Sequence, residues 1–153
     1  MKAIHWITAA AALAFAGPVQ AGISDPEVII YRFPGVNNSG ADGAGVATVF
    51  HCTNFSGDIE NVRIVTRRFD TAIASNVVLS IPHLGTLAMS THLVNSYGNT
   101  SMVTALVIEG TAAISATSIN VICSAMVIDA ASSRPDGVAL RGIRFSPVPG
   151  SQE

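Results

Sequence analysis

The sequence predicts an all-β domain, built as a two-sheet antiparallel sandwich of about seven to nine strands. Short apolar runs rich in Val, Ile and Thr recur along the chain, and Gly, Pro, Asn or Asp marks the turns between them. No helical period runs far after residue 21. Strands at this spacing are typical of two-sheet sandwiches and, less often, of small barrels. We therefore expect one sandwich domain.

The first 21 residues have the pattern of a secretory signal peptide. Lys2 supplies a positive charge, an apolar run covers 7–16, and a Gly-Pro break precedes small residues that end at Ala21. The apolar run is too short to span a bilayer as a stable helix. We expect cleavage after Ala21, no membrane span in the mature chain, and a secreted or periplasmic protein. The alternative is an uncleaved N-terminal anchor.

Removing 21 of the 153 residues leaves 132, which is enough for one domain. We place the β-sandwich domain at 22–145 and an extended C-terminal tail at 146–153. The remaining residues include seven arginines and ten acidic residues, which gives a net charge of −3 with neutral histidines. Nucleic-acid binding depends on a basic excess, so the composition argues against it. Charged residues make up 12% of the chain, well below the usual quarter or so, and the surface must be built largely from small polar residues.

Four strands are predicted in the N-terminal half, each rich in β-branched residues and each followed by a turn signal. They are "EVIIYRF" at 27–33, "VATVFHC" at 46–52, "NVRIVTRRF" at 61–69 and "NVVLSI" at 76–81. The glycine-rich stretch 35–45 is predicted to be a loop.

Five more strands are predicted in the C-terminal half. They are "TLAMSTHLV" at 86–94, "MVTALVIEG" at 102–110, "AISAT" at 113–117, "INVICSAMVID" at 119–129 and "VALRGIRF" at 138–145. In the last of these the apolar positions change parity after Leu140. A bulge at Gly142 would restore one apolar face, and we predict one there.

Both cysteines lie on core-facing positions of strong strands. Strand alternation places Cys52 beside Phe50 and Cys123 beside Val121 and Ala125. An even cysteine count in an exported protein favours pairing, so we predict a Cys52–Cys123 disulfide, with two buried free thiols as the alternative. The separation resembles that of the inter-sheet pair of immunoglobulin-type domains, and this resemblance implies a sandwich with immunoglobulin-like architecture. The tryptophan and tyrosine that accompany that pair in antibody domains are absent here, so membership of the antibody superfamily is not expected.

Four stretches of the chain resemble a group of short exported bacterial proteins that carry no assigned activity. They are "CTNFSG", "IPHLGT", "NVICSAMVIDA" and "GVALRGIRFSPVPGSQE". The resemblance implies a secreted, single-domain β protein. It transfers no functional residue.

Three histidines remain after the signal peptide, at positions 51, 83 and 92. A blue-copper site would need a histidine close behind the cysteine, and only Met126 follows Cys123. His83 and His92 lie nine residues apart at the two ends of one predicted strand, about 30 Å if extended, too far to share an ion. We therefore predict no metal and no other cofactor. The alternative is a periplasmic metal-binding protein that uses His51, His83 or His92.

Motifs of catalysis are not found. The sequence has no Gly-x-Ser-x-Gly elbow, no phosphate-binding loop and no calcium loop. We therefore predict that the protein is not an enzyme. The alternative is an enzyme whose site is assembled from loops.

The stretch "RIVTRRF" is the one concentration of charge. Arg63 and Arg67 share a strand face, and Arg68 lies opposite. Together they form a candidate patch for an anion or an acidic partner. The alternative is a solvated face that is paired with nearby acidic residues.

The outward face of 119–129 is also apolar, at Ile122, Met126 and Ile128. Exposed apolar strands favour association, and we predict self-association through this face. The function predicted from the sequence is a non-catalytic extracytoplasmic module for binding, adhesion or assembly. Its partner is an unknown protein or glycan.

Overall fold

The computed structural model describes residues 27–145, which form ten β-strands and no helix. The all-β prediction is confirmed, while the predicted signal peptide and C-terminal tail lie outside the described residues. The strands are β1 (Val28–Ala41), β2 (Ala44–Asn54), β3 (Glu60–Arg68), β4 (Ile73–Ile81), β5 (Thr86–Ser90), β6 (Thr100–Ser101), β7 (Val107–Ala116), β8 (Val121–Asp129), β9 (Gly137–Leu140) and β10 (Ile143–Arg144).

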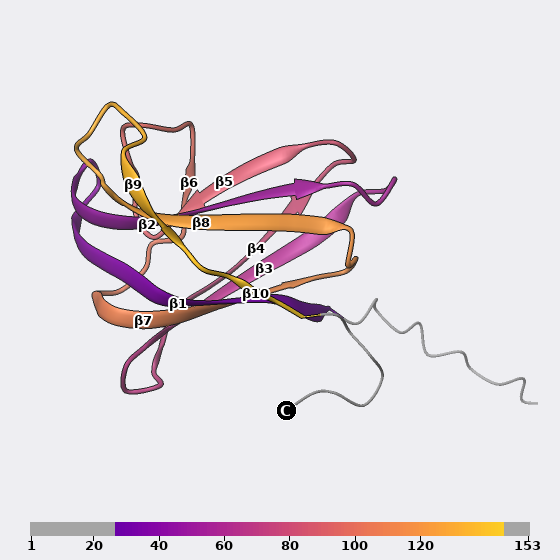
Figure 1. The fold of residues 1–153 in the computed structure, drawn as a ribbon, viewed down its shortest axis with the longest axis horizontal. Helices are drawn as coiled ribbons and strands as arrows, with labels where there is room; N and C mark the ends of the chain where they lie inside the picture. Colours follow the sequence, from indigo (N-terminus) through magenta and orange to yellow (C-terminus); the bar gives the residue numbers. More distant parts are fainter. Residues whose placement is uncertain (1–26, 146–153) are drawn as a thin grey trace, which may run out of the picture.

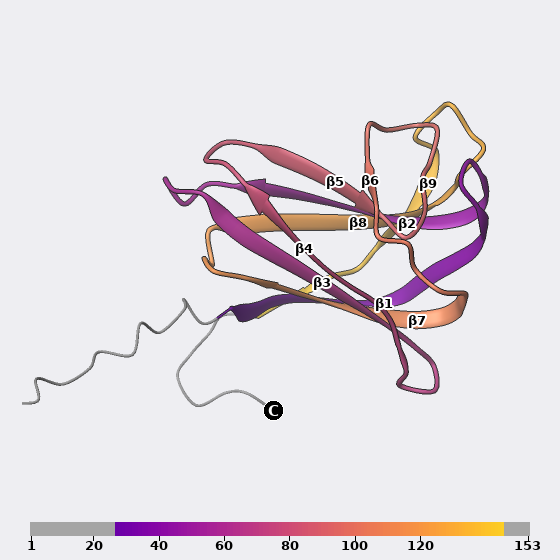
Figure 2. The same cartoon turned by 180° about the vertical axis from the view of Figure 1, so that it is seen from behind.

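These strands form a strongly curled sheet in the order β4-β3-β7-β1-β2-β5-β6. In addition β10 pairs with β1, and β8 pairs with β2 and β9. All pairs are antiparallel except β5 with β6. Figures 1 and 2 show that the curl brings β5, β2 and β8 opposite β7 and the first part of β1. We call the first part the β2 layer. The second part, together with β3, which pairs with β7, is the β7 layer.

β1 connects the two layers because it is much longer than the predicted strand 27–33. Its residues up to Asn38 pair with β7, and Ser39 to Ala41 pair with β2. Gly40 and Gly45 face each other across this hairpin, both with positive φ, and a Cβ on either would lie within 2.3 Å of a backbone oxygen of the opposite strand. The predicted loop 35–45 is therefore wrong, since only Asp42 and Gly43 form the turn.

Two other glycines mark close approaches rather than turns or bulges. β7 replaces two predicted strands because Gly110 lies within it, where a Cβ would be 2.4 Å from the Arg67 carbonyl oxygen. The predicted strand 138–145 divides into β9, which pairs with β8, and β10, which pairs with β1. The predicted bulge at Gly142 is thus wrong. The chain crosses there between layers, and a Cβ at Gly142 would lie 2.4 Å from the Phe33 ring.

The main core lies between the two layers. Phe33, Ile64 and Ile114 enter it from the β7 layer, and Phe50 and Met89 from the β2 layer, all fully or almost fully buried. The Phe33 and Phe50 rings meet edge to face, with their centroids 5.9 Å apart. Burial of each such side chain contributes about 1.5–3 kcal/mol, so this contact between layers is a main source of stability.

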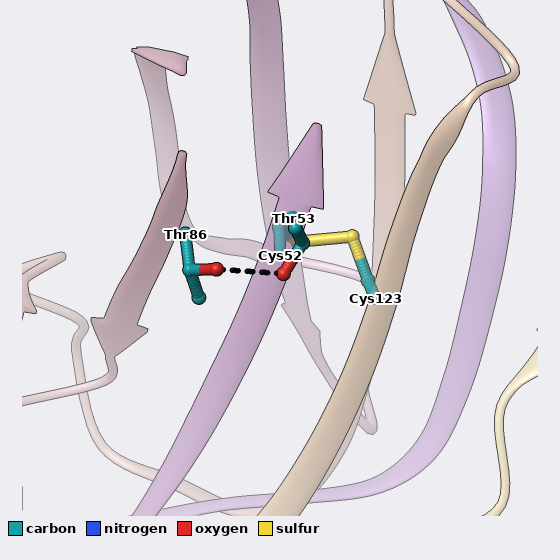
Figure 3. Close-up of a disulfide and its surroundings, with 4 residues drawn as sticks. All are labelled: Cys52, Thr53, Thr86 and Cys123. Carbon is teal, nitrogen blue, oxygen red and sulfur yellow. Dashed lines mark hydrogen bonds between the residues drawn. A yellow bond between two sulfur atoms is a disulfide. The ribbon is translucent and has the colours of Figure 1, made fainter. Parts of the chain in front are cut away.

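Cys52 and Cys123 form the predicted disulfide within the core (Figure 3). They are register partners on β2 and β8, with Cα atoms 4.2 Å apart. The bond therefore joins neighbouring strands of one layer. The similarity to the inter-sheet pair of immunoglobulin-type domains does not hold at this point, because that pair joins opposite sheets.

The disulfide is expected to contribute strongly to stability, because it joins cysteines 71 positions apart in sequence. In the chain-entropy model, closing a loop of this length stabilises the fold by about 4 kcal/mol. We predict that the double substitution Cys52→Ala and Cys123→Ala lowers the free energy of unfolding by about this amount in urea titrations. A loss below about 1 kcal/mol would show that the bond does not constrain the chain as described.

Candidate functional site

Three loops gather at the end of the fold where the described chain begins and ends (Figure 1, right). They are residues 55–59 between β2 and β3, 82–85 between β4 and β5, and 117–120 between β7 and β8. We call this surface the Asn54 loop end, after the last residue of β2. The name reflects the role of that side chain in holding the loops.

Asn54 is completely buried, and its amide is fully hydrogen-bonded. Nδ2 donates to the carbonyl oxygens of Asp58 at 2.7 Å and Ile81 at 2.8 Å, and Oδ1 accepts from the Ser56 amide at 2.8 Å. Its backbone amide donates to Gly85 O and its carbonyl accepts from Leu84 N. Because a buried amide is costly unless it is paired, these bonds fix the first two loops relative to each other.

The remaining contacts join the loops into one unit. The Phe55 amide donates to Asn120 O at 3.0 Å, which links the first and third loops. The Gly57 amide donates to His83 Nδ1 at 3.0 Å, which links the first and second. Arg144 Nη2 donates to Ile119 O at 2.7 Å and ties the third loop to β10. The three loops are thus cross-linked on a sheet scaffold that the disulfide reinforces.

These fixed loops expose four large apolar side chains. Phe55 is 50%, Ile59 72%, Leu84 65% and Ile119 48% exposed. Leu84 also has φ of 60°, in the left-handed region that a leucine rarely adopts. Exposed apolar side chains on rigid loops, one of them in an unfavourable backbone conformation, are typical of a recognition surface.

The three histidines lie apart. His83 belongs to the Asn54 loop end, His51 lies mid-strand on β2 with its ring centroid 4.6 Å from that of Tyr97, and His92 is buried beyond β5. Residues 27–145 contain no group of three His, Cys, Asp or Glu side chains placed to hold a metal ion.

His92 is engaged within the fold by both ring nitrogens. Nδ1 lies 2.5 Å from Asn38 Oδ1, and Nε2 lies 3.1 Å from Ala44 O. The Asn38 amide nitrogen in turn donates to the carbonyl oxygens of Thr104 and Ala105. This buried contact holds the β1–β2 hairpin against the segment that precedes β7.

Arg63 forms a two-pronged ion pair on the outer side of the β7 layer. Its Nε lies 2.6 Å from Glu27 Oε2 and its Nη2 3.1 Å from Oε1, while Nη1 donates to Asn76 Oδ1. Hydrogen bonding from Arg63 lowers the pKa of the Glu27 carboxyl group, with further help from Ser115.

The other two arginines of the predicted patch also have partners within the chain. Arg67 Nη1 donates to Thr71 O at 2.9 Å, and Arg68 Nη2 lies 2.7 Å from Asp70 Oδ2. The predicted placement of Arg63 and Arg67 on one face agrees with the exposure pattern of β3, in which Arg67 is exposed. Binding of an anion or an acidic partner to Arg63, Arg67 and Arg68 stays a prediction, and it would require these contacts to be exchanged.

The predicted self-association face is mostly covered by the chain itself. Ile128 is buried in a second apolar cluster with Val94, and Met126 packs against the same cluster. The Tyr97 hydroxyl donates to Met126 Sδ at 3.4 Å. Of the three predicted residues only Ile122 is exposed, because the loop after β5 folds over the others.

Asn54, Phe55 and Leu84 were not predicted as site residues from the sequence. Leu84 lies inside the turn signal 82–85, and Phe55 directly precedes the turn residues 56–58, where a large apolar side chain has no strand face through which to reach the core. That mismatch was the available signal. The bonds of Asn54 to Ser56 and Asp58 are local and are typical of an asparagine at a turn. Its bond to Ile81, 27 residues away, had no signal in the sequence.

Comparison with known proteins assigns no family to this chain. No protein-family model matches it, and neither does any curated protein or solved structure. In residues 27–145 no helix is long and apolar enough to cross a membrane. The resemblance to short exported bacterial proteins stays an expectation from the sequence.

Partial burial lowers the pKa of His51. The unfolded chain then takes up a proton near the ordinary value of about 6.5, whereas the folded protein resists protonation, so stability falls as the pH drops below that value. We predict that His51→Phe, which keeps a ring against Tyr97, shows a smaller loss of unfolding free energy between neutral and mildly acidic pH than the wild type. Equal pH dependence in urea titrations would contradict the assignment.

Proposed function

We propose that this protein is a non-catalytic extracytoplasmic module that binds a protein partner through the Asn54 loop end. The observation that carries the proposal is the combination of four exposed apolar side chains with loops fixed by a buried amide. Loops that are already ordered lose little conformational freedom on binding, so more of the contact energy appears as affinity.

The chemistry of the surface favours a protein partner over a glycan. Three of the four exposed side chains are aliphatic, and only Phe55 offers an aromatic face. Its charged groups are few, with Asp58 beside Ile59 and no arginine among the loop residues. An apolar groove or ridge on another protein complements such a surface, since interface centres are poor in charge.

Export and membership of the two-sheet sandwich class belong to the same proposal. The Cys52–Cys123 bond is compatible with an oxidising compartment, where disulfides persist. The two facing layers support a sandwich, while the in-layer position of the disulfide separates it from antibody-type domains. We propose that the chain is cleaved after Ala21 and acts in the periplasm or outside the cell.

The proposal is tested by photo-crosslinking followed by affinity measurement. A photoreactive residue at Ile59 should trap a partner in the exported fraction, whereas the same residue at the exposed Val138 of β9 should not trap it. The purified partner is then titrated calorimetrically against Leu84→Asn. Asparagine tolerates the left-handed backbone, so folding is preserved while the apolar side chain is lost.

We expect Leu84→Asn to weaken binding about tenfold or more without lowering the melting temperature. Phe55→Ser should weaken binding similarly, and Val138→Ser should leave it unchanged. A partner that binds Leu84→Asn and Phe55→Ser as tightly as it binds the wild type would refute the loop end as the binding surface.

A further inference from the structure

The edges of the sheet are protected unequally. β6 and β10 have two residues each, and β9 has four residues preceded by Arg134, Pro135 and Asp136. Short edges, charge and proline are the usual means by which proteins prevent a free strand edge from pairing with another chain. β4 has nine residues, Ile73–Ile81, none of which is charged or a proline or glycine. Within residues 27–145 it pairs only with β3.

Residues at both ends of β4 bond to other parts of the chain, so only the middle of its edge is left uncovered. At its start the Ala105 amide donates to Ala74 O, and Thr104 Oγ1 donates to Ser75 Oγ. At its end Ile81 O accepts from the Asn54 side chain. The uncovered segment is therefore 76–80, and its midpoint is Val78.

The core is incompletely closed beside this segment. Val77 and Leu79 point toward the main core and pack against it, yet both stay partly exposed. Val78 and Asn76 lie on the outward face. A strand added along β4 would cover Val77 and Leu79 as well as use the free backbone groups.

We propose that β4 pairs antiparallel with β4 of a second copy of this chain, about a two-fold axis at Val78. In this register Val78 faces the other copy's Val78, Val77 faces Leu79, and Asn76 faces Ser80. Apolar residues then meet apolar residues, and the Asn76 amide meets the Ser80 hydroxyl. Within each copy Asn76 Oδ1 also accepts from Arg63, and Ser80 Oγ donates to Asn61 Oδ1. Arg63 lies opposite Val78 on β3 and is paired with Glu27, and β4 itself carries no charge, so no like charges oppose each other in this register.

We infer that the partner strand is a second copy because the uncovered segment 76–80 is self-complementary about a two-fold axis at its midpoint. The interface is the same surface on both molecules, so a single sequence has to satisfy itself at every position. The segment 76–80 does so about Val78. The proposed pairing is argued from residues of β4 alone and uses no side chain of the Asn54 loop end, so it can fail without affecting the proposed partner binding.

The register is tested by disulfide trapping in the oxidised exported protein. Val78→Cys places two thiols opposite each other on the axis, and we expect a covalent dimer under a mild oxidant. The control is Ser80→Cys on the same face of the same strand. Its two thiols would be offset by four residues, about 13 Å along the strand, and should not link.

Sedimentation velocity tests the dimer itself. We expect the wild type to dimerise at micromolar concentration, and Val78→Lys, which opposes two charges on the axis, to raise the dissociation constant at least about tenfold. Val138→Lys on β9 should leave it unchanged. A monomeric wild type, equal trapping of Ser80→Cys and Val78→Cys, or dissociation by Val138→Lys alone would overturn the proposal.

Discussion

The pairing of β2 with β8 is the constraint on which the rest of the structure depends. Their register runs without interruption from Val46 opposite Asp129 to Asn54 opposite Val121, and the Cys52–Cys123 bond locks it covalently. Asn54 lies two positions after Cys52 on the same core-facing side of β2. Its hydrogen bonds connect this fixed strand end to the loops. The fixed strand end and the buried amide act together, because the amide holds the loops only if its own backbone is immobile.

Buried polar groups, rather than apolar contacts alone, position the loops at both ends of the fold. At one end Asn54 bonds through its side chain to one loop and to the end of β4, and through its backbone to the loop 82–85. At the other end His92 and Asn38 join the β1–β2 hairpin to the chain before β7. Buried hydrogen bonds of this kind favour one arrangement, because a rearrangement that breaks them leaves a buried polar atom unpaired. The exposed apolar side chains at the Asn54 loop end are therefore presented in a defined arrangement.

Local patterns in the sequence predicted the strands and the disulfide, but not the places where the chain passes from one layer to the other or where two strands approach closely. Alternation identified β2 and β8 and placed both cysteines in the core, because those features depend on neighbouring residues. Gly40, Gly45, Gly110 and Gly142 were interpreted as loop, turn or bulge signals. Each is glycine because another chain segment passes too closely for a Cβ, and such a contact is set by tertiary structure.

The same limit applies to the candidate site. The apolar outward face of β8 could be predicted from the sequence. The loop that covers Met126 and Ile128 could not, because it comes from residues 94–97. The exposed residues Phe55 and Leu84 lie beside and within turn signals, which were interpreted only as boundaries between strands. A large apolar side chain in a turn was thus a better indicator of exposed surface here than an apolar strand face.

Amide hydrogen exchange on the oxidised protein tests the central claim, that Asn54 makes these loops rigid. The account predicts slow exchange at the Ser56 and Leu84 amides, close to that of β2, because both donate to Asn54. In Asn54→Ala the protection of Ser56 should be lost, since its acceptor is the side chain. Exchange of both amides in the wild type as fast as in an unstructured peptide would contradict the account.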